Sequence, residues 1–117
     1  MAAILKTSIG NIVYSDDFLA KISGLRAMEC YGIVGMASTN PADGLVSLLK
    51  IDNLKKGIKI VTDDSDNISV TLHVIVLNGI SISEVARNII DTVKYGIESC
   101  TGLNVKNVDV VVQGIKF

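Results

Sequence analysis

Residues 68–77 read Ile-Ser-Val-Thr-Leu-His-Val-Ile-Val-Leu, and this stretch decides the fold. Apolar side chains occupy every second position from Ile68 to Val76, the period of a β-strand with one buried face. The opposite face begins polar and turns apolar at its end; it carries Ser69, Thr71, His73, Ile75 and Leu77. Gly57–Thr62 precedes this strand, and the polar turn Asp63–Asn67 separates the two, so we predict a β-hairpin.

Two long helices flank this hairpin in the sequence. Ser15 followed by Asp16 and Asp17 is typical of a helix start, and we expect that helix to run to Glu29 with Phe18, Ile22, Leu25 and Met28 on its apolar stripe. Ala20, Gly24 and Ala27 form a second strip of small residues that permits close packing. Ser81 and Glu84 fit a capping box for the other helix, which should end near Cys100 with Ala86, Ile89, Ile90, Val93, Ile97 and Cys100 inward.

The remaining segments complete a single small domain over residues 1–117. We expect a kinked strand at Ile4–Tyr14, a short strand at Ile33–Ala37, a short helix at Asp43–Leu49 and a last strand at Val105–Ile115. Hairpins combined with helices favour an α+β fold. We therefore predict one mixed sheet of about five strands, two long helices and one short helix, arranged as two related strand–helix–strand units.

Composition excludes several classes of protein. The chain carries 11 Lys and Arg against 12 Asp and Glu, so its net charge of -1 does not draw it toward nucleic acid or acidic lipid. Charged residues make up 20% of the chain with one proline, which excludes a disordered protein. The longest aliphatic run, Val74–Leu77, is far below the roughly 20 residues of a membrane span, and the N-terminus lacks the pattern of a signal peptide. We expect a cytoplasmic protein.

Few residues could carry catalysis or hold a metal ion. His73 is the single histidine, and its place within a strand favours a hydrogen-bonded sheet residue over a general base. The acidic run Asp63–Asn67 lacks the glycine and glutamate of a calcium loop, and we interpret it as a solvated turn. Cys30 and Cys100 lie near helix C-termini, where thiolates are disfavoured, so we predict two small core residues. The sequence predicts no enzyme, cofactor, metal or small-molecule substrate.

One short motif supports an alternative function. Gly32-Ile33-Val34-Gly35 matches the GxxG loop of KH nucleic-acid-binding modules, in which backbone N–H groups meet phosphates. Lys55 and Lys56 could supply a basic patch beside it. The middle residues of the motif are apolar and no aromatic side chains interleave with the lysines, so nucleic acid is the lesser hypothesis.

Motifs along nearly the whole chain resemble one known family. They are Ile9–Phe18, Ile22–Glu29, Gly32–Met36, Lys56–Ile60, Ser83–Ile89, Thr101–Leu103, Val108–Val110 and Gly114–Phe117, in this order. The set is similar to the alkaline-shock and general-stress protein family, the envelope stress response proteins of Gram-positive bacteria. Cys30-Tyr31 departs from the family's usual pair, and the acidic tail of some members does not follow Phe117.

The resemblance implies a small cytoplasmic α+β protein without catalytic residues. Some members of the family self-assemble and reach the membrane through a separate anchoring protein. From the residues, we predict that Ile75, Leu77 and Val111 form an interaction surface, because a second apolar sheet face left in water is unfavourable. We expect a homo-oligomeric scaffold or adaptor at the inner face of the cell membrane, bound there through a membrane-anchored partner and not by direct insertion.

Overall fold

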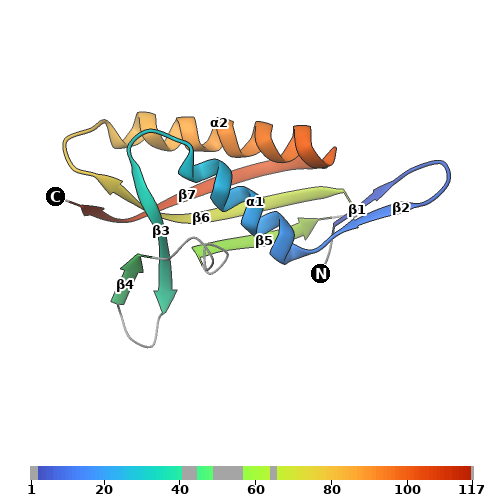
Figure 1. Ribbon diagram of the computed structural model, residues 1–117, viewed down its shortest axis with the longest axis horizontal. Coiled ribbons are helices and arrows are strands. Elements are labelled where there is room, and N and C mark those ends of the chain that lie inside the picture. Colours follow the sequence, from blue (N-terminus) through green and yellow to red (C-terminus); the bar gives the residue numbers. More distant parts are fainter. Residues whose placement is uncertain (1–2, 41–44, 49–56, 64–65, 117) are drawn as a thin grey trace.

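The computed structural model describes residues 3–40, 45–48, 57–63 and 66–116. A twisted β-sheet forms one layer, and two helices lie side by side across one of its faces (Figure 1). In chain order the elements are β1 (Ala3–Lys6), β2 (Asn11–Tyr14), α1 (Asp16–Met28), β3 (Ile33–Asn40), β4 (Leu45–Leu48), β5 (Ile58–Asp63), β6 (Asn67–Leu77), α2 (Ile82–Thr101) and β7 (Asn104–Lys116). The predicted α+β class is confirmed.

Strand β6 is the centre of the main sheet. Strand β7 runs parallel to it along one edge, from Asn67↔Asn104 to Leu77↔Lys116. Two antiparallel strands share the other edge: β5 pairs with the first half of β6, and β3 pairs with the second half. Because β4 extends the sheet beyond β3, the main sheet has 5 strands and is mixed, as predicted.

The alternation in β6 builds the core as the sequence predicts. Every second side chain from Ile68 to Val76 is buried, and these residues pack against the inner faces of both helices. Ile89, Val93 and Ile97 on α2 are fully buried against them. Burial of aliphatic side chains on this scale is the main force that holds the helices to the sheet.

Helix α1 is rotated relative to the prediction. Ser15 is its N-cap, and the Ser15 hydroxyl accepts a hydrogen bond from the Phe18 N–H at 3.2 Å, as expected. The small-residue strip faces inward, and the buried residues of the helix are Leu19, Ala20, Ser23, Gly24 and Ala27. Phe18 and Leu25, from the predicted apolar stripe, are exposed instead. Small side chains allow α1 to lie close to α2 and the sheet, and this contact outweighs the burial of two larger residues.

Helix α2 begins and ends where the sequence indicates, but its capping box is absent. Ser81 is the N-cap, yet its side chain makes no capping hydrogen bond. At the other end Gly102 adopts the left-handed conformation that ends many helices, with φ of 76°. The predicted inward residue Cys100 is exposed, while Thr101 is buried in its place.

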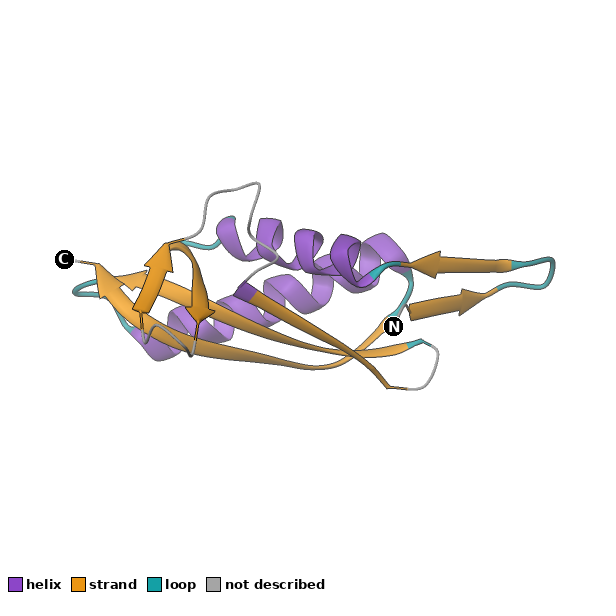
Figure 2. Cartoon of the chain, turned by 90° about the horizontal axis from the view of Figure 1, so that it is seen from below, coloured by secondary structure: helices purple, strands orange, loops and turns teal. Residues whose placement is uncertain are grey.

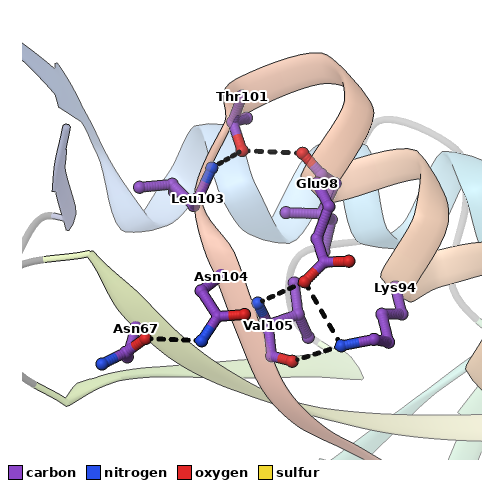
Figure 3. Close-up of polar contacts among 8 residues, drawn as sticks. Asn67, Lys94, Glu98, Thr101, Leu103, Asn104 and Val105 are labelled. Atoms are coloured by element: carbon purple, nitrogen blue, oxygen red, sulfur yellow. Dashed lines mark hydrogen bonds and ion pairs between the residues drawn. The ribbon is translucent and has the colours of Figure 1, made fainter.

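A polar clamp fixes the sharp reversal from α2 into β7 (Figure 3). The Glu98 carboxylate accepts hydrogen bonds from the Val105 N–H at 3.0 Å and from the Lys94 ammonium at 3.2 Å. Lys94 also donates to the Val105 carbonyl at 2.8 Å. The hydrogen bond from Val105, followed by the interaction with Lys94, lowers the pKa of Glu98 below its ordinary value, although partial desolvation opposes the shift.

Three further expectations are wrong in part. Ile4–Tyr14 is not one kinked strand: β1 and β2 form a separate 2-stranded sheet joined by a tight turn. The predicted short helix at Asp43–Leu49 is replaced over its described residues by strand β4, and its remaining positions lie outside the described residues. Only β6–α2–β7 is a strand–helix–strand crossover within the main sheet, because the strand before α1 belongs to the small one.

Candidate interaction surface

The face of the main sheet that points away from the helices is graded along its length. Its polar half lies where β6 begins, next to β7. There the Ser69 hydroxyl donates to the Asn107 side chain at 2.8 Å, and the Asn107 amide donates to Asp109 at 3.2 Å. Thr71 pairs across the ladder with Asp109. Ser69, Asn107 and Asp109 are thus linked by hydrogen bonds and remain in contact with solvent, so this half of the face is stable in water.

His73 lies at the middle of the gradient. Its Nδ1 is 3.1 Å from the Gln113 side-chain nitrogen, and the ring is half-buried between the strands. This environment confirms the interpretation of a hydrogen-bonded sheet histidine. The tautomer that leaves Nδ1 as an acceptor fits a Gln113 donor.

The apolar half begins at Ile75. This residue pairs with Gly35 of β3 on one side and with Gly114 of β7 on the other. Neither neighbour has a side chain that could cover Ile75 from the adjacent strand. A Cβ placed on Gly114 would meet no heavy atom of the described residues within 4 Å. The surface is therefore open to side chains of another molecule on the Gly114 side of Ile75, whereas Gly35 on the other side is buried.

Leu77 and Val111 border this open region. Leu77 is 39% exposed and Val111 is 36% exposed. The three predicted surface residues share one face, but none of them is directly opposite another: Val111 pairs with His73, and Leu77 pairs with Lys116. They form a diagonal across two strands with a polar residue at each margin.

The structure does not support the KH-like alternative. A GxxG loop must lie between two helices, whereas Ile33–Gly35 forms the beginning of β3 and Gly35 is buried. Gly32 precedes the strand in a turn, with φ of 91°, and a Cβ there would approach the Ile80 Cδ1 atom to 2.6 Å. Close packing against α2 thus accounts for Gly32. Lys55 and Lys56 lie outside the described residues.

The cysteines have different environments. Cys30 is buried as predicted, with its Sγ 3.8 Å from the Arg26 carbonyl and 3.9 Å from the Asn88 carbonyl. Cys100 is exposed, and the prediction of a core residue is wrong because α2 turns this position toward solvent. In the described part of the chain, no three His, Cys, Asp or Glu side chains are grouped so that they could hold a metal ion.

Two exposed apolar regions of the molecule were not predicted from the sequence. One is the outer side of α1, where Phe18 and Leu25 contact water. The other is the β1–β2 hairpin, which projects from one end of the molecule (Figure 2). Its turn is built by Thr7 and Gly10, and the glycine at that position was the signal that could have predicted a hairpin rather than a kink.

These features define a class of protein: a two-layer α+β domain that covers one sheet face with helices and presents a second, partly apolar face. Over the described residues neither helix has the length and apolar character required to span a membrane.

The chain belongs to the alkaline shock protein 23 family, described as having a cell envelope-related function, whose model matches residues 5–117. This confirms the resemblance found in the sequence motifs.

The chain is 39% identical over 117 residues to the uncharacterized protein YloU of Bacillus subtilis (strain 168), covering 99% of this chain and 97% of that one. It is 40% identical to the uncharacterized protein Spy1614 of Streptococcus pyogenes serotype M6, covering 99% and 96%. It is 27% identical to the uncharacterized Bacillus subtilis protein YqhY over 95% of this chain and 81% of the other. No solved structure matches.

Proposed function

We propose that this protein is a non-enzymatic, self-associating scaffold or adaptor that acts in the cytoplasm next to the cell envelope. The observation that carries the proposal is the apolar half of the open sheet face, formed by Ile75, Leu77 and Val111. Gly114 lies beside Ile75 in β7 and a Cβ there would meet no described atom within 4 Å, so a partner surface can approach the sheet backbone closely on that side. Contact with a second copy removes these side chains from water, which stabilises the complex by about 25 cal/mol for each Å² of apolar area buried.

The envelope-related description of the family supports the location. A separate membrane-anchored protein, as the family resemblance implies, is the proposed link to the membrane. A fluorescent fusion should then outline the cell periphery. Uniform cytoplasmic fluorescence would contradict the envelope location and leave the self-association unaffected.

The self-association is tested by light scattering over a wide concentration series. The wild-type mass should rise above that of one chain, and Val111→Asp should lower it, because a carboxylate at the contact must be desolvated. Val61→Asp is the matched control: Val61 is also an exposed valine, 47% exposed against 36%, on the same open face but beside Ser69 at the polar half. Leu77→Asp should behave as Val111→Asp does. Equal masses for the Val61 and Val111 variants, with the wild type associated, would refute this surface.

A further inference from the structure

The β1–β2 hairpin, here called the arm (Ala3–Tyr14), exposes apolar side chains that the fold does not use. Ile9 at its tip is 98% exposed, and Val13 is 62% exposed. Ile12 is also exposed and, as a neighbour of Val13 in the same strand, lies on the opposite face of the arm. An isolated two-stranded hairpin is only marginally stable in water. The base of the arm packs on the domain through Ala3, Leu5 and Tyr14, whereas towards the tip apolar side chains on both of its faces lack cover.

The arm is nevertheless held in a defined shape. At its base Ala3 is buried and the Tyr14 hydroxyl donates to the Thr101 carbonyl at 2.9 Å. At its tip the Thr7 N–H donates to the Gly10 carbonyl at 2.8 Å, and the Gly10 N–H donates to the Thr7 hydroxyl at 3.1 Å. These bonds fix the turn and leave Ile9 pointing away from the molecule.

An apolar groove lies at the opposite end. It has a volume of about 320 Å³ and is lined by Tyr31, Ile80, Ser81, Glu84, Val85 and Asn88. We call it the Tyr31 groove. Gly32 shapes it, because the missing side chain at this position lets Ile80 and Val85 pack against the turn backbone. The aromatic ring of Tyr31 forms an exposed wall, 76% accessible to solvent.

Charge is complementary between the two ends. Lys6 is the single charged residue of the arm, and Glu84 is the single charged residue that lines the groove. Both side chains are exposed. A contact that inserts Ile9 between Tyr31 and Ile80 can therefore place an ammonium and a carboxylate at its margin, where such a pair favours one orientation over others.

The arm cannot fill the groove of its own chain. The molecule measures 52 × 31 × 21 Å, and the arm extends from the end farthest from the α1–β3 turn and the start of α2 (Figure 1). We infer that the tip of the arm docks in the Tyr31 groove of a second copy of this chain. This inference rests on the proposed self-association and assigns it a second contact, separate from the open sheet face.

Such a contact joins two different surfaces, the arm of one copy and the groove of another, so it can be isologous in a closed dimer or heterologous in a head-to-tail chain. If two copies lie antiparallel, each arm enters the groove of the other copy and a closed dimer forms. If the copies follow one another head to tail, each addition leaves a free arm and a free groove, and the mass increases with concentration. Either result fits the docking, and the dependence of mass on concentration distinguishes them.

Two matched pairs of variants test the contact by light scattering. Ile9→Asp should raise the concentration at half-assembly at least tenfold, whereas Ser8→Asp introduces the same charge at the neighbouring exposed tip residue and should change it less than twofold. Tyr31→Asp should also weaken assembly at least tenfold. Its control is Tyr95→Asp, because Tyr95 is 75% exposed but belongs to the middle of α2.

Mixing makes the test specific. Ile9→Asp retains an intact groove and Tyr31→Asp retains an intact arm, so a mixture of the two variants should form 1:1 heterodimers although neither associates through this contact alone. Lys6→Glu and Glu84→Lys should each weaken assembly, and their combination in one chain should restore it. If Ile9→Asp and Tyr31→Asp each assembled as well as the wild type does, the docking would be overturned.

These variants separate the two proposals. If Val111→Asp lowers the mass while Ile9→Asp and Tyr31→Asp do not, the sheet-face proposal stands and the arm inference fails. If only the arm and groove variants lower the mass, the arm inference stands and the sheet-face contact fails. A wild-type monomer throughout the concentration series would refute both.

Discussion

Gly32 connects the path of the chain to the packing of the helices. Its φ of 91° lies in the left-handed region, and its Cα faces the first turn of α2. A side chain here would be placed 2.6 Å from the Ile80 Cδ1 atom and 2.8 Å from the Val85 Cγ2 atom. The residue is thus required for two reasons, backbone conformation and space, which a substitution series can separate.

Gly32→Ala should destabilise the fold by about 2–5 kcal/mol, the sum of a left-handed alanine and an overpacked contact. Gly79→Ala is the control, since Gly79 also has a positive φ, 85°, but a Cβ there meets no described atom within 4 Å. It should cost roughly 1–2 kcal/mol from conformation alone. Urea unfolding measures both free energies, and equal losses would show that the contact with α2 contributes nothing.

Glu98 gives the stability a dependence on pH. Because its pKa is lowered in the folded state, the stability that it contributes is fully present above the pKa of the unfolded chain and is lost as the pH falls through the folded value. Glu98→Gln should therefore reduce the loss of stability that follows acidification below the ordinary pKa of a glutamate, and should lower the stability at neutral pH because a neutral amide accepts weaker hydrogen bonds than a carboxylate.

The same substitution at the exposed Glu84, at the other end of α2, is the control for Glu98→Gln. Unfolding in urea at several pH values gives, for each protein, the slope of the free energy of unfolding against pH. A Glu98→Gln slope equal to that of the wild type would contradict the assigned role of the clamp.

At the scale of elements, α1 shows that a helix can carry two faces that both satisfy helical spacing. One face is buried and, apart from Leu19, made of small residues. The other is larger, with Phe18 and Leu25 exposed and Ile22 and Met28 half-buried against the core. The two helices pack closely where Gly96 of α2 makes room for the half-buried Arg26 of α1: a Cβ on Gly96 would lie 2.7 Å from the Arg26 Cγ atom. A bulkier residue at the crossing would push the helices apart and open the core beneath them.

Two leucines on α1 test this orientation. Leu19 is fully buried and Leu25 is 43% exposed. Leu19→Ala should cost about 2–5 kcal/mol through lost burial and the cavity left behind, whereas Leu25→Ala should cost less than about 1 kcal/mol. Thermal and urea unfolding give both values. The reverse order would mean that α1 buries the stripe suggested by hydrophobicity.

These elements also show what the sequence could reveal. The strand β6 and its buried face were predictable because its period of two is unambiguous over ten residues. The same pattern also predicted which side chains of β6 lie on the face that carries the candidate surface. The two glycines beside Ile75 could not be predicted, because they meet it only through the β3 pairing and the irregularities in the β3 and β7 registers. The orientation of α1 was equally hidden, since it depends on the distance to α2.

At the scale of the whole molecule, one layer of helices protects one face of the sheet. Cys30 lies within this arrangement, near carbonyl oxygens of both helices, while Cys100 lies on its outside. The two thiols therefore report on different parts of the same native structure, one on its surface and one on the integrity of the helix layer.

A thiol reagent in excess should modify one cysteine rapidly and the other only as fast as the helix layer opens. Cys100→Ser should remove the rapid phase, and Cys30→Ser should remove the slow one. Low urea should accelerate only the slow phase, because burial and not reactivity limits it. Two rapid phases in the native protein would contradict the burial of Cys30.

The long parallel pairing of β6 with β7 has a mechanical consequence. The N-terminal arm and the C-terminal end of β7 lie at opposite ends of the molecule (Figure 1). Tension applied along that axis pulls β7 lengthwise past β6, so the hydrogen bonds from Asn104 to Lys116 share the force instead of opening one after another. Force applied to the C-terminal end of β7 should therefore be resisted by the whole ladder until its hydrogen bonds break together.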